Sequence, residues 1–172
     1  MVAESNNKEL LDRIEQDAAA CEKEMHACAR CALLAIARNL KLAEDECIDA
    51  ALRTAIPLSG GIAGTRNQCG ALVGGIMAIG LAMVKGNPRE AAVEERKASM
   101  KVSKQFYRWF EKEIGQVRCY DIRDAGLGRS FDTSDPEEMK KFVAAGGYEL
   151  CGGVVGKASR KAAEMILESQ EA

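Results

Sequence analysis

The chain has 172 residues, 47% of them apolar and 29% charged, and a formal net charge of −2. This composition is typical of a globular protein with one substantial core. Lys and Arg are interleaved with Asp and Glu along the whole chain, which argues against a nucleic-acid partner.

The N-terminal segment, Met1 to Arg13, is polar and charged and lacks the apolar stretch of a secretory signal. We therefore expect a cytoplasmic protein. Its seven cysteines would be kept reduced in that compartment, so metal ligation or redox exchange explains them better than a set of structural disulfides does.

Helical periodicity dominates the first half of the chain. From Leu11 to Ala35, apolar residues recur at steps of three and four, which predicts one long amphipathic helix. A second helix is predicted from about Glu44 to Ile56, because Pro57 should stop it, and residues 59–64 should form a loop.

The run from Cys69 to Val84 is apolar throughout and rich in glycine. It falls short of the roughly 20 residues of a membrane span. We therefore expect a central helix buried on all sides and no membrane partner. Gly70 and Gly74 lie one helical turn apart, so their shared face should allow another helix to approach closely.

The second half is also predicted to be helical. Asn87 and Pro88 favour the start of a helix that should end at Gly115, and residues 116–133 should be irregular. Ser134 and Glu137 have capping-box spacing, which predicts a further helix that breaks at residues 146–147.

A final helix is expected from about Cys151 to Glu168, and no segment has the period of two that a strand requires. The predicted fold class is therefore all-α: a single-domain helical bundle over residues 1–172 with a buried Gly-rich central helix. Residues 1–27 should form an N-terminal helical extension of this domain.

Four cysteines begin or adjoin predicted helices or helix ends. Thiols that converge from different helices can hold a metal or a cluster, and backbone N–H groups at helix N-termini favour the thiolate form. Helix dipoles there would also stabilise an anionic iron–sulfur cluster, as would the nearby Arg66 and Arg118. These cysteines are Cys31, Cys69, Cys119 and Cys151.

The second of these cysteines opens the sequence Cys69-Gly70-Ala71-Leu72-Val73-Gly74, which has the pattern CGAxxG, with one cysteine before it and two after it. From about residue 31 to residue 166 the chain resembles the C_GCAxxG_C_C family of redox-active proteins. The family's four defining cysteines fall on Cys31, Cys69, Cys119 and Cys151. The family is similar to the cysteine-containing domain of split-Soret cytochrome c. This resemblance implies that the four cysteines bind an iron–sulfur cluster of the [2Fe–2S] type, which would transfer electrons.

The remaining cysteines admit simpler interpretations. Cys28 and Cys31 have CxxC spacing, but Ala32 stands where a haem-binding histidine would be needed, so no c-type haem is expected. Cys28 remains an additional candidate ligand, although Cys21 and Cys28 share the apolar face of the first helix and could simply pack there. Cys47 follows two acidic residues that disfavour a thiolate, so packing is expected for it too.

Two other functions stay open at this point. A thiol–disulfide protein could use Cys28 and Cys31 or a pair among the family cysteines, and a structural or sensory module could bind zinc. Hydrolysis is disfavoured because His26 is the lone histidine, is expected on the surface, and no GxSxG or HExxH motif occurs. The sequence leaves open whether the protein is an enzyme, which redox protein is its partner, and whether it forms a homodimer.

Overall fold

The computed structural model describes residues 2–171, with the side chains of residues 6–170. Over this range the chain forms eight α-helices and one short 3₁₀-helix, with no strand, which confirms the predicted all-α class. The elements are α1 (Val2–Met25), α2 (Cys28–Leu40), α3 (Asp45–Ala55), η1 (Ile56–Leu58), α4 (Gly70–Met83), α5 (Val93–Ile114), α6 (Cys119–Leu127), α7 (Pro136–Ala144) and α8 (Gly147–Glu171).

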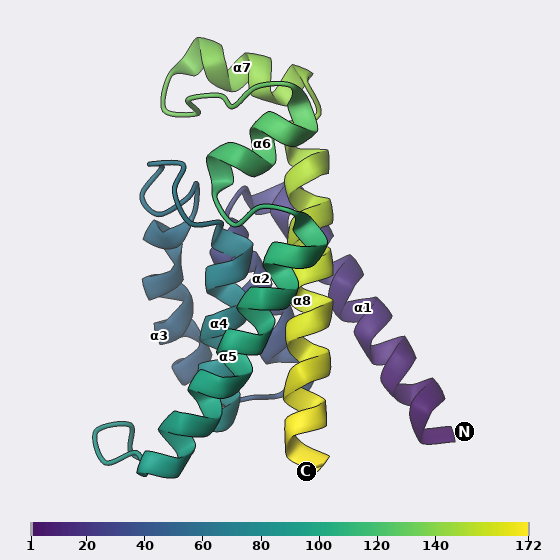
Figure 1. Ribbon diagram of the computed structural model, residues 1–172, viewed down its shortest axis with the longest axis vertical. Helices are drawn as coiled ribbons and strands as arrows, with labels where there is room; N and C mark the ends of the chain where they lie inside the picture. The colour runs from purple at the N-terminus through teal and green to yellow at the C-terminus, as the bar shows by residue number, and fades with distance from the viewer. Residues whose placement is uncertain (1, 172) are drawn as a thin grey trace.

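Helix α8 is the axis of the bundle. It packs against α1, α2, α4 and α5, while α6 and α7 contact it near its N-terminal end. Figure 1 shows α6 and α7 stacked at that end of the molecule, opposite the C-terminal end of α8. The chain thus places a small helical layer over one end of the main bundle.

Small residues let the long helices approach closely. A Cβ atom on Gly156 of α8 would lie 2.8 Å from the carbonyl oxygen of Glu15 in α1, and one on Gly152 would lie 3.1 Å from that of Ala19. Both distances are below or at the lower limit of ordinary contacts, so glycine is required where α1 crosses α8. The core between the helices is apolar and includes the fully buried side chains of Ile14, Leu33, Ile36, Leu72, Phe106, Phe110 and Ile166.

Helix α4 lies between α2, α5 and α8. A Cβ on Gly74 would overlap the carbonyl oxygen of Ala29 in α2, and one on Gly75 would lie 2.5 Å from the ring of Phe106 in α5. This confirms the predicted close packing at the CGAxxG glycines. Helix α4 is not buried on all sides as predicted, because Val73 and Ile76 on its outer face are only half-buried. No helix in the described range is long and apolar enough to cross a membrane.

The predicted long first helix is wrong in one respect that matters for the site. The chain turns at His26, which has a left-handed φ of 53°, and Ala27 then occupies the N-cap position of α2. The turn lets α1 and α2 both pack against α8, whereas one continuous helix could cover only one side of it. Its consequence is that Cys28 is the first residue of a helix rather than an internal one.

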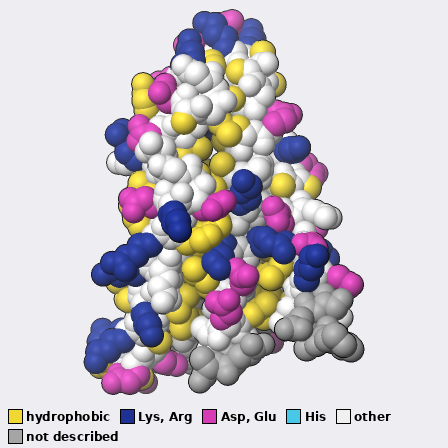
Figure 2. Space-filling view, turned by 45° about the vertical axis from the view of Figure 1, so that its right-hand side comes forward, with side chains coloured by type: hydrophobic (Ala, Val, Ile, Leu, Met, Phe, Trp, Pro, Cys, Tyr) yellow, Lys and Arg dark blue, Asp and Glu magenta, His cyan; other side chains and the backbone are white. Residues whose placement is uncertain are grey.

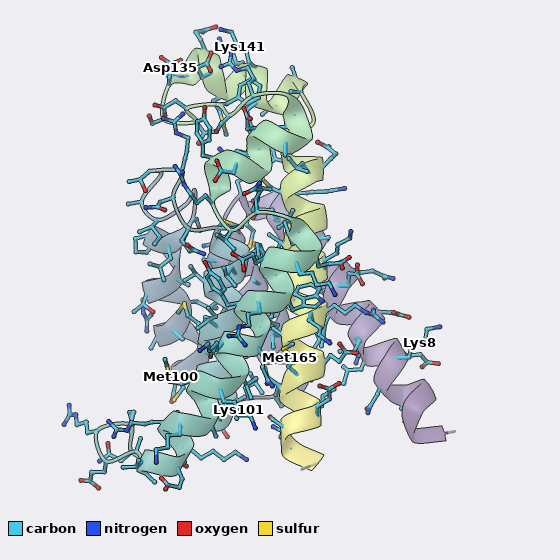
Figure 3. All side chains as sticks on the ribbon, viewed as in Figure 1. Lys8, Met100, Lys101, Asp135, Lys141 and Met165 are labelled. Carbon is cyan, nitrogen blue, oxygen red and sulfur yellow. A yellow bond between two sulfur atoms is a disulfide. The ribbon has the colours of Figure 1, made fainter. Side chains whose placement is uncertain are left out.

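Two predicted helix starts also differ from the structure. Asn87 closes a turn by accepting a hydrogen bond from the Arg89 N–H (3.1 Å), and the helix begins only at Val93, where the Glu95 carboxylate accepts from the Ala92 N–H (3.3 Å). The side chain that caps α7 is Asp135, labelled in Figure 3, and Ser134 is not the cap.

Two segments are more helical than predicted. Residues 119–127, expected to be irregular, form α6, and α8 begins at Gly147 instead of near Cys151. Packing of both helices onto the bundle end supplies stability that local sequence signals do not show. On the face shown in Figure 2, Lys and Arg side chains are interspersed with Asp and Glu, with apolar side chains between them.

Candidate functional site

A cavity of about 250 Å³ lies where α6 and α7 cover the end of the bundle. Its wall is formed by residues of α1, α2, α4, α6, α7 and α8, and four of its side chains are cysteines. Three of them, Cys69, Cys119 and Cys151, were predicted to come together; the fourth is Cys28. The other wall residues include Glu22, His26, Gly60, Gly70, Ile122, Arg123, Met139, Phe142, Tyr148 and Val155.

Backbone hydrogen bonds hold two of these cysteines beside each other. Cys69 is the N-cap residue of α4 and its N–H donates to the carbonyl of Val117 (2.9 Å), while Cys119 begins α6 and its N–H donates to the carbonyl of Asn67 (2.6 Å). Each cysteine-bearing segment is thus tied to the other immediately before its helix starts. Both thiols are nearly buried, at 8% exposure.

Glycines shape the space around Cys28. A Cβ on Gly70 would overlap the Cys28 Sγ, so the cysteine sulfur fits only because residue 70 lacks a side chain. The backbone of Gly60 acts to lower the pKa of the Cys28 thiol, against the larger effect of burial. Gly60 belongs to a loop in which residues 60–64 all have positive φ angles between 52° and 76°. Ile62 and Ala63 rarely adopt this conformation, which marks the loop as a strained segment next to the cavity.

Cys151 reaches the cavity from α8, one turn into the helix, where it is half-buried. The Arg123 guanidinium is buried close to the sulfurs of Cys119 and Cys151, whose negative charge would raise its pKa although burial opposes this. Because Arg123 lies one helical turn after Cys119 on α6, it faces the cysteines of both α6 and α8.

The predicted fourth ligand, Cys31, does not line the cavity. It is completely buried and its Sγ is bonded to that of Cys21 in α1, with a Cα–Cα distance of 5.5 Å. Cys28 and Cys31 lie about 60° apart around α2, so one faces the cavity and the other faces α1. The predicted packing of Cys21 and Cys28 is confirmed, because both side chains are partly buried against the core, in addition to the roles that the structure gives their sulfurs. The predicted packing of Cys47 is wrong, because Cys47 is exposed on α3.

Arg123 and Glu22 are charged side chains that the sequence analysis missed. Arg123 is 7% exposed and Glu22 is 4% exposed. Within the described part of the chain, Nε and Nη1 of Arg123 and Oε2 of Glu22 have no hydrogen-bond partner. Burying a guanidinium costs several kcal/mol unless it is paired. Arg123 lies close enough to Glu22 to lower the pKa of that carboxyl, although burial raises the pKa overall.

Burial controls the ionisation of the cavity groups. It raises the pKa of Glu22 to about 7, of Cys28 to about 11 and of Cys151 to about 12, and it also raises the pKa of Cys69 and Cys119. Thiols held neutral in this way are poor nucleophiles. A bound metal would reverse this preference, since ligation deprotonates a thiol.

Aromatic rings close the cavity on the side of α7. The guanidinium of Arg123 lies 4.3 Å from the ring centre of Phe142, and the ring of Tyr148 packs edge-on against Phe142 at 5.2 Å. His26 stacks on Tyr148 at 3.7 Å and is exposed, as predicted for a surface residue. The stack ties the turn between α1 and α2 to the first turn of α8.

Cysteine thiolates can bind either a single metal ion or a cluster of several metals. In the described range, no three His, Cys, Asp or Glu side chains converge on a position where one metal ion could bind. The four thiols instead stand around a cavity.

Comparisons with known proteins were made for the whole chain. No match to a curated protein or to a solved structure was found. A family model described as "Putative redox-active protein (C_GCAxxG_C_C)" matches residues 26–165, a range that contains all four cavity cysteines, Arg123 and the CGAxxG glycines. The chain therefore belongs to the C_GCAxxG_C_C family of redox-active proteins.

Proposed function

We propose that Cys28, Cys69, Cys119 and Cys151 bind an iron–sulfur cluster of the [2Fe–2S] type and that the protein transfers electrons through it. The observation that carries this proposal is the set of four thiols around one cavity whose wall also contains a buried guanidinium without a full set of partners. The cluster would supply one-electron redox chemistry. In this assignment Cys28 takes the place first given to Cys31.

The charges of the cavity fit an anionic group. A cluster with four thiolate ligands is negative, and Arg123 presents two unpartnered N–H-bearing nitrogens beside Cys119 and Cys151. Burial acts to lower the pKa of the Arg123 guanidinium, but negative charge on Cys119 and Cys151 would raise it above its usual value, so ligated thiolates would keep this side chain charged. Bound negative charge would give these nitrogens of Arg123 hydrogen-bond partners.

The backbone and the apolar wall would tune such a group. The backbones of Gly60 and Ala71 act to lower the pKa of Cys28 and Cys69, and N–H groups directed at sulfur favour the more negative, reduced form of a cluster. Ile122, Phe142 and Val155 keep water from one side of the cavity. The half-buried Cys28 and Cys151 bring the site close to the surface, where a redox partner could approach.

Metal analysis of anaerobically purified protein tests the proposal directly. We expect a brown protein with iron and acid-labile sulfide in equal amounts, and an electron paramagnetic resonance signal after reduction. A colourless protein with stoichiometric zinc would support the structural or sensory module instead. A colourless protein with no metal, after cluster reconstitution has also failed, would contradict both metal assignments.

Substitution of Arg123 tests its role as a counter-charge. Arg123→Met should lower the reduction potential by on the order of tens of millivolts and weaken cluster retention, because a positive charge favours the form with the added electron. Arg123→Lys should keep much of the wild-type potential. Arg118→Met is a matched control: Arg118 is half-exposed and pairs with Asp121 (3.7 Å), so its loss should change the potential little. Equal shifts in Arg123→Met and Arg118→Met would contradict the specific role of Arg123.

A further inference from the structure

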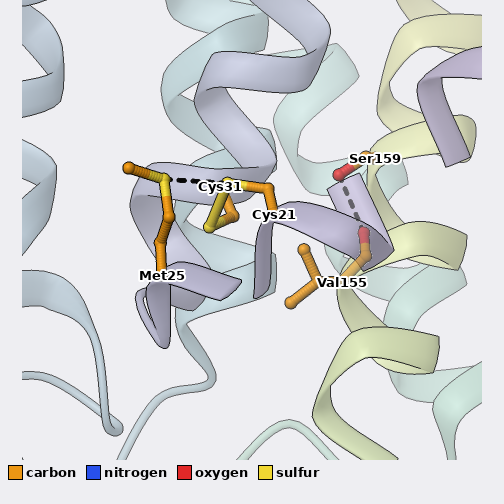
Figure 4. Close-up of a disulfide and its surroundings, with 5 residues drawn as sticks. All are labelled: Cys21, Met25, Cys31, Val155 and Ser159. Atoms are coloured by element: carbon orange, nitrogen blue, oxygen red, sulfur yellow. Dashed lines mark hydrogen bonds between the residues drawn. A yellow bond between two sulfur atoms is a disulfide. The ribbon is translucent and has the colours of Figure 1, made fainter. Parts of the chain in front are cut away.

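The bonded pair of Cys21 and Cys31 stands apart from the cavity. Cys21 lies in the last two turns of α1 and Cys31 in the first turn of α2, and the two helices are joined by a two-residue turn. Figure 4 shows their bonded sulfurs between the helices, with the sulfur of Met25 beside Cys21 at 3.5 Å. Neither cysteine lines the cavity that holds the other four thiols.

The two sulfurs of this pair differ in access. Cys31 is completely buried, whereas Cys21 is half-buried and lines a surface depression of about 330 Å³ between α1 and α2. An attacking thiolate must approach one sulfur of a disulfide, and the other sulfur then leaves. Of the two cysteines only Cys21 lines this depression, whose rim also includes Asp17, Glu24, Met25, Arg38 and Asn39.

The buried partner is the one that leaves. Cys31 is completely buried and burial disfavours a free thiolate, as it does at Cys28 in the same turn of α2, so Cys31 must gain a proton as the Cys21–Cys31 bond breaks. The partial positive charge at the start of a helix offsets part of this cost. The break at His26 and Ala27 creates this helix N-terminus four residues before Cys31.

We propose that Cys21 and Cys31 form a second redox centre, a dithiol–disulfide couple that exchanges two electrons with an external dithiol at the Cys21 sulfur. One thiolate of the dithiol attacks the Cys21 Sγ, the Cys21–Cys31 bond breaks, and Cys31 leaves as a thiolate that takes up a proton. The second thiolate of the dithiol then attacks the mixed disulfide, so that Cys21 leaves and is protonated while the dithiol becomes a disulfide. Two electrons and two protons have passed to the protein.

This couple does not depend on the cluster, because it uses neither a cavity thiol nor Arg123. It adds a two-electron centre to a chain for which the cavity cysteines support one-electron transfer. The segment between Cys21 and Cys31 carries Glu22, His26 and Cys28 to the cavity wall, so the two centres share the same turn of the chain.

The first test is a thiol titration of the full-length protein carrying Cys47→Ser, which removes the other exposed cysteine. The protein is equilibrated with mixtures of reduced and oxidised dithiothreitol, trapped with a maleimide, and mapped by peptide mass spectrometry. We expect Cys21 and Cys31 to become labelled together in one two-electron transition. In such a transition, a tenfold change in the ratio of reduced to disulfide-bonded protein corresponds to a change of about 30 mV in the potential. A pair that stays bonded, or stays reduced, across the whole range would overturn the proposal.

The second test addresses the asymmetry, using glutathione disulfide as the probe. In Cys31→Ser the remaining Cys21 thiol should form a mixed disulfide with glutathione, whereas in Cys21→Ser the buried Cys31 should react at least tenfold more slowly. Equal adduct formation in the two variants would mean that Cys21 is not the entry point. Iron is measured on the same samples. Its absence from every sample would contradict the proposed cluster, whereas the glutathione result would still decide the proposal for Cys21 and Cys31.

Discussion

Cys28→Ser is expected to lose most of the bound iron and of the visible absorbance, while Cys31→Ser is expected to retain both. The Cys28 sulfur lies in the cavity, against Gly70 and the backbone of Gly60, and serine binds iron more weakly than a thiolate does. Cys31 faces α1 and is bonded to Cys21, so its replacement leaves the cavity thiols in place. The measurement is iron and sulfide content with the absorption spectrum, on protein purified or reconstituted anaerobically.

Two further variants control for indirect effects. Cys21→Ser removes the same crosslink as Cys31→Ser, so any change shared by these two variants reports the lost Cys21–Cys31 bond. Cys47→Ser removes an exposed thiol of α3 and should alter nothing. If Cys31→Ser lost its iron while Cys21→Ser and Cys28→Ser kept theirs, the first ligand would be Cys31 and the present assignment would be incorrect.

The part of the site that could be predicted depended on short-range signals. Cys69, Cys119 and Cys151 could be selected because the CGAxxG pattern and the order of the cysteines around it resemble a known family, and the structure places all three in one cavity. Gly70 and Gly74 could be assigned to close packing because their spacing puts them on one face of an apolar helix, and the contacts with α2 agree. The inference about the two glycines needs only the helical repeat, because residue spacing in the sequence directly gives the face of a helix on which a residue lies.

The choice between Cys28 and Cys31 could not be made in the same way. The apolar repeat of α1 continues in step across His26 and Ala27 into α2, and neither residue is a glycine or a proline, so nothing local marked the break. The turn exists because it lets two helices pack on α8. Without knowledge of that packing, the face of α2 directed at the cavity could not be known.

Arg123 and Glu22 illustrate a different limit. Each is one charged residue among many on an amphipathic helix, where the usual expectation is an exposed position. Their burial follows from the layer of α6 and α7 over the bundle end and from the ring of Phe142 against Arg123. Both are consequences of tertiary contacts between segments far apart in the chain.

The glycines of α4 offer a matched pair for testing how the fold holds the site. A Cβ on Gly74 would overlap the Ala29 carbonyl oxygen and lie 2.9 Å from the Ala32 Cβ, and these backbone-linked atoms cannot move aside without shifting α2. A Cβ on Gly80, in the same helix, would meet no atom within 4 Å. Gly126 of α6 is exposed but is a less suitable control, because a Cβ there would lie 2.6 Å from the Leu150 side chain.

Gly74→Ala is therefore expected to lower the free energy of unfolding by about 1–3 kcal/mol through overpacking, and Gly80→Ala to raise it by about 0.5–1 kcal/mol through better helix propensity. For a chain of this size each kcal/mol corresponds to about 2–4 °C in Tm, so the two variants should shift in opposite directions in a thermal melt. Because Ala29 follows Cys28 directly, Gly74→Ala should also reduce the iron retained per chain, whereas Gly80→Ala should not. Stabilisation by both substitutions would show that α2 and α4 are not in the close contact that sets the position of Cys28.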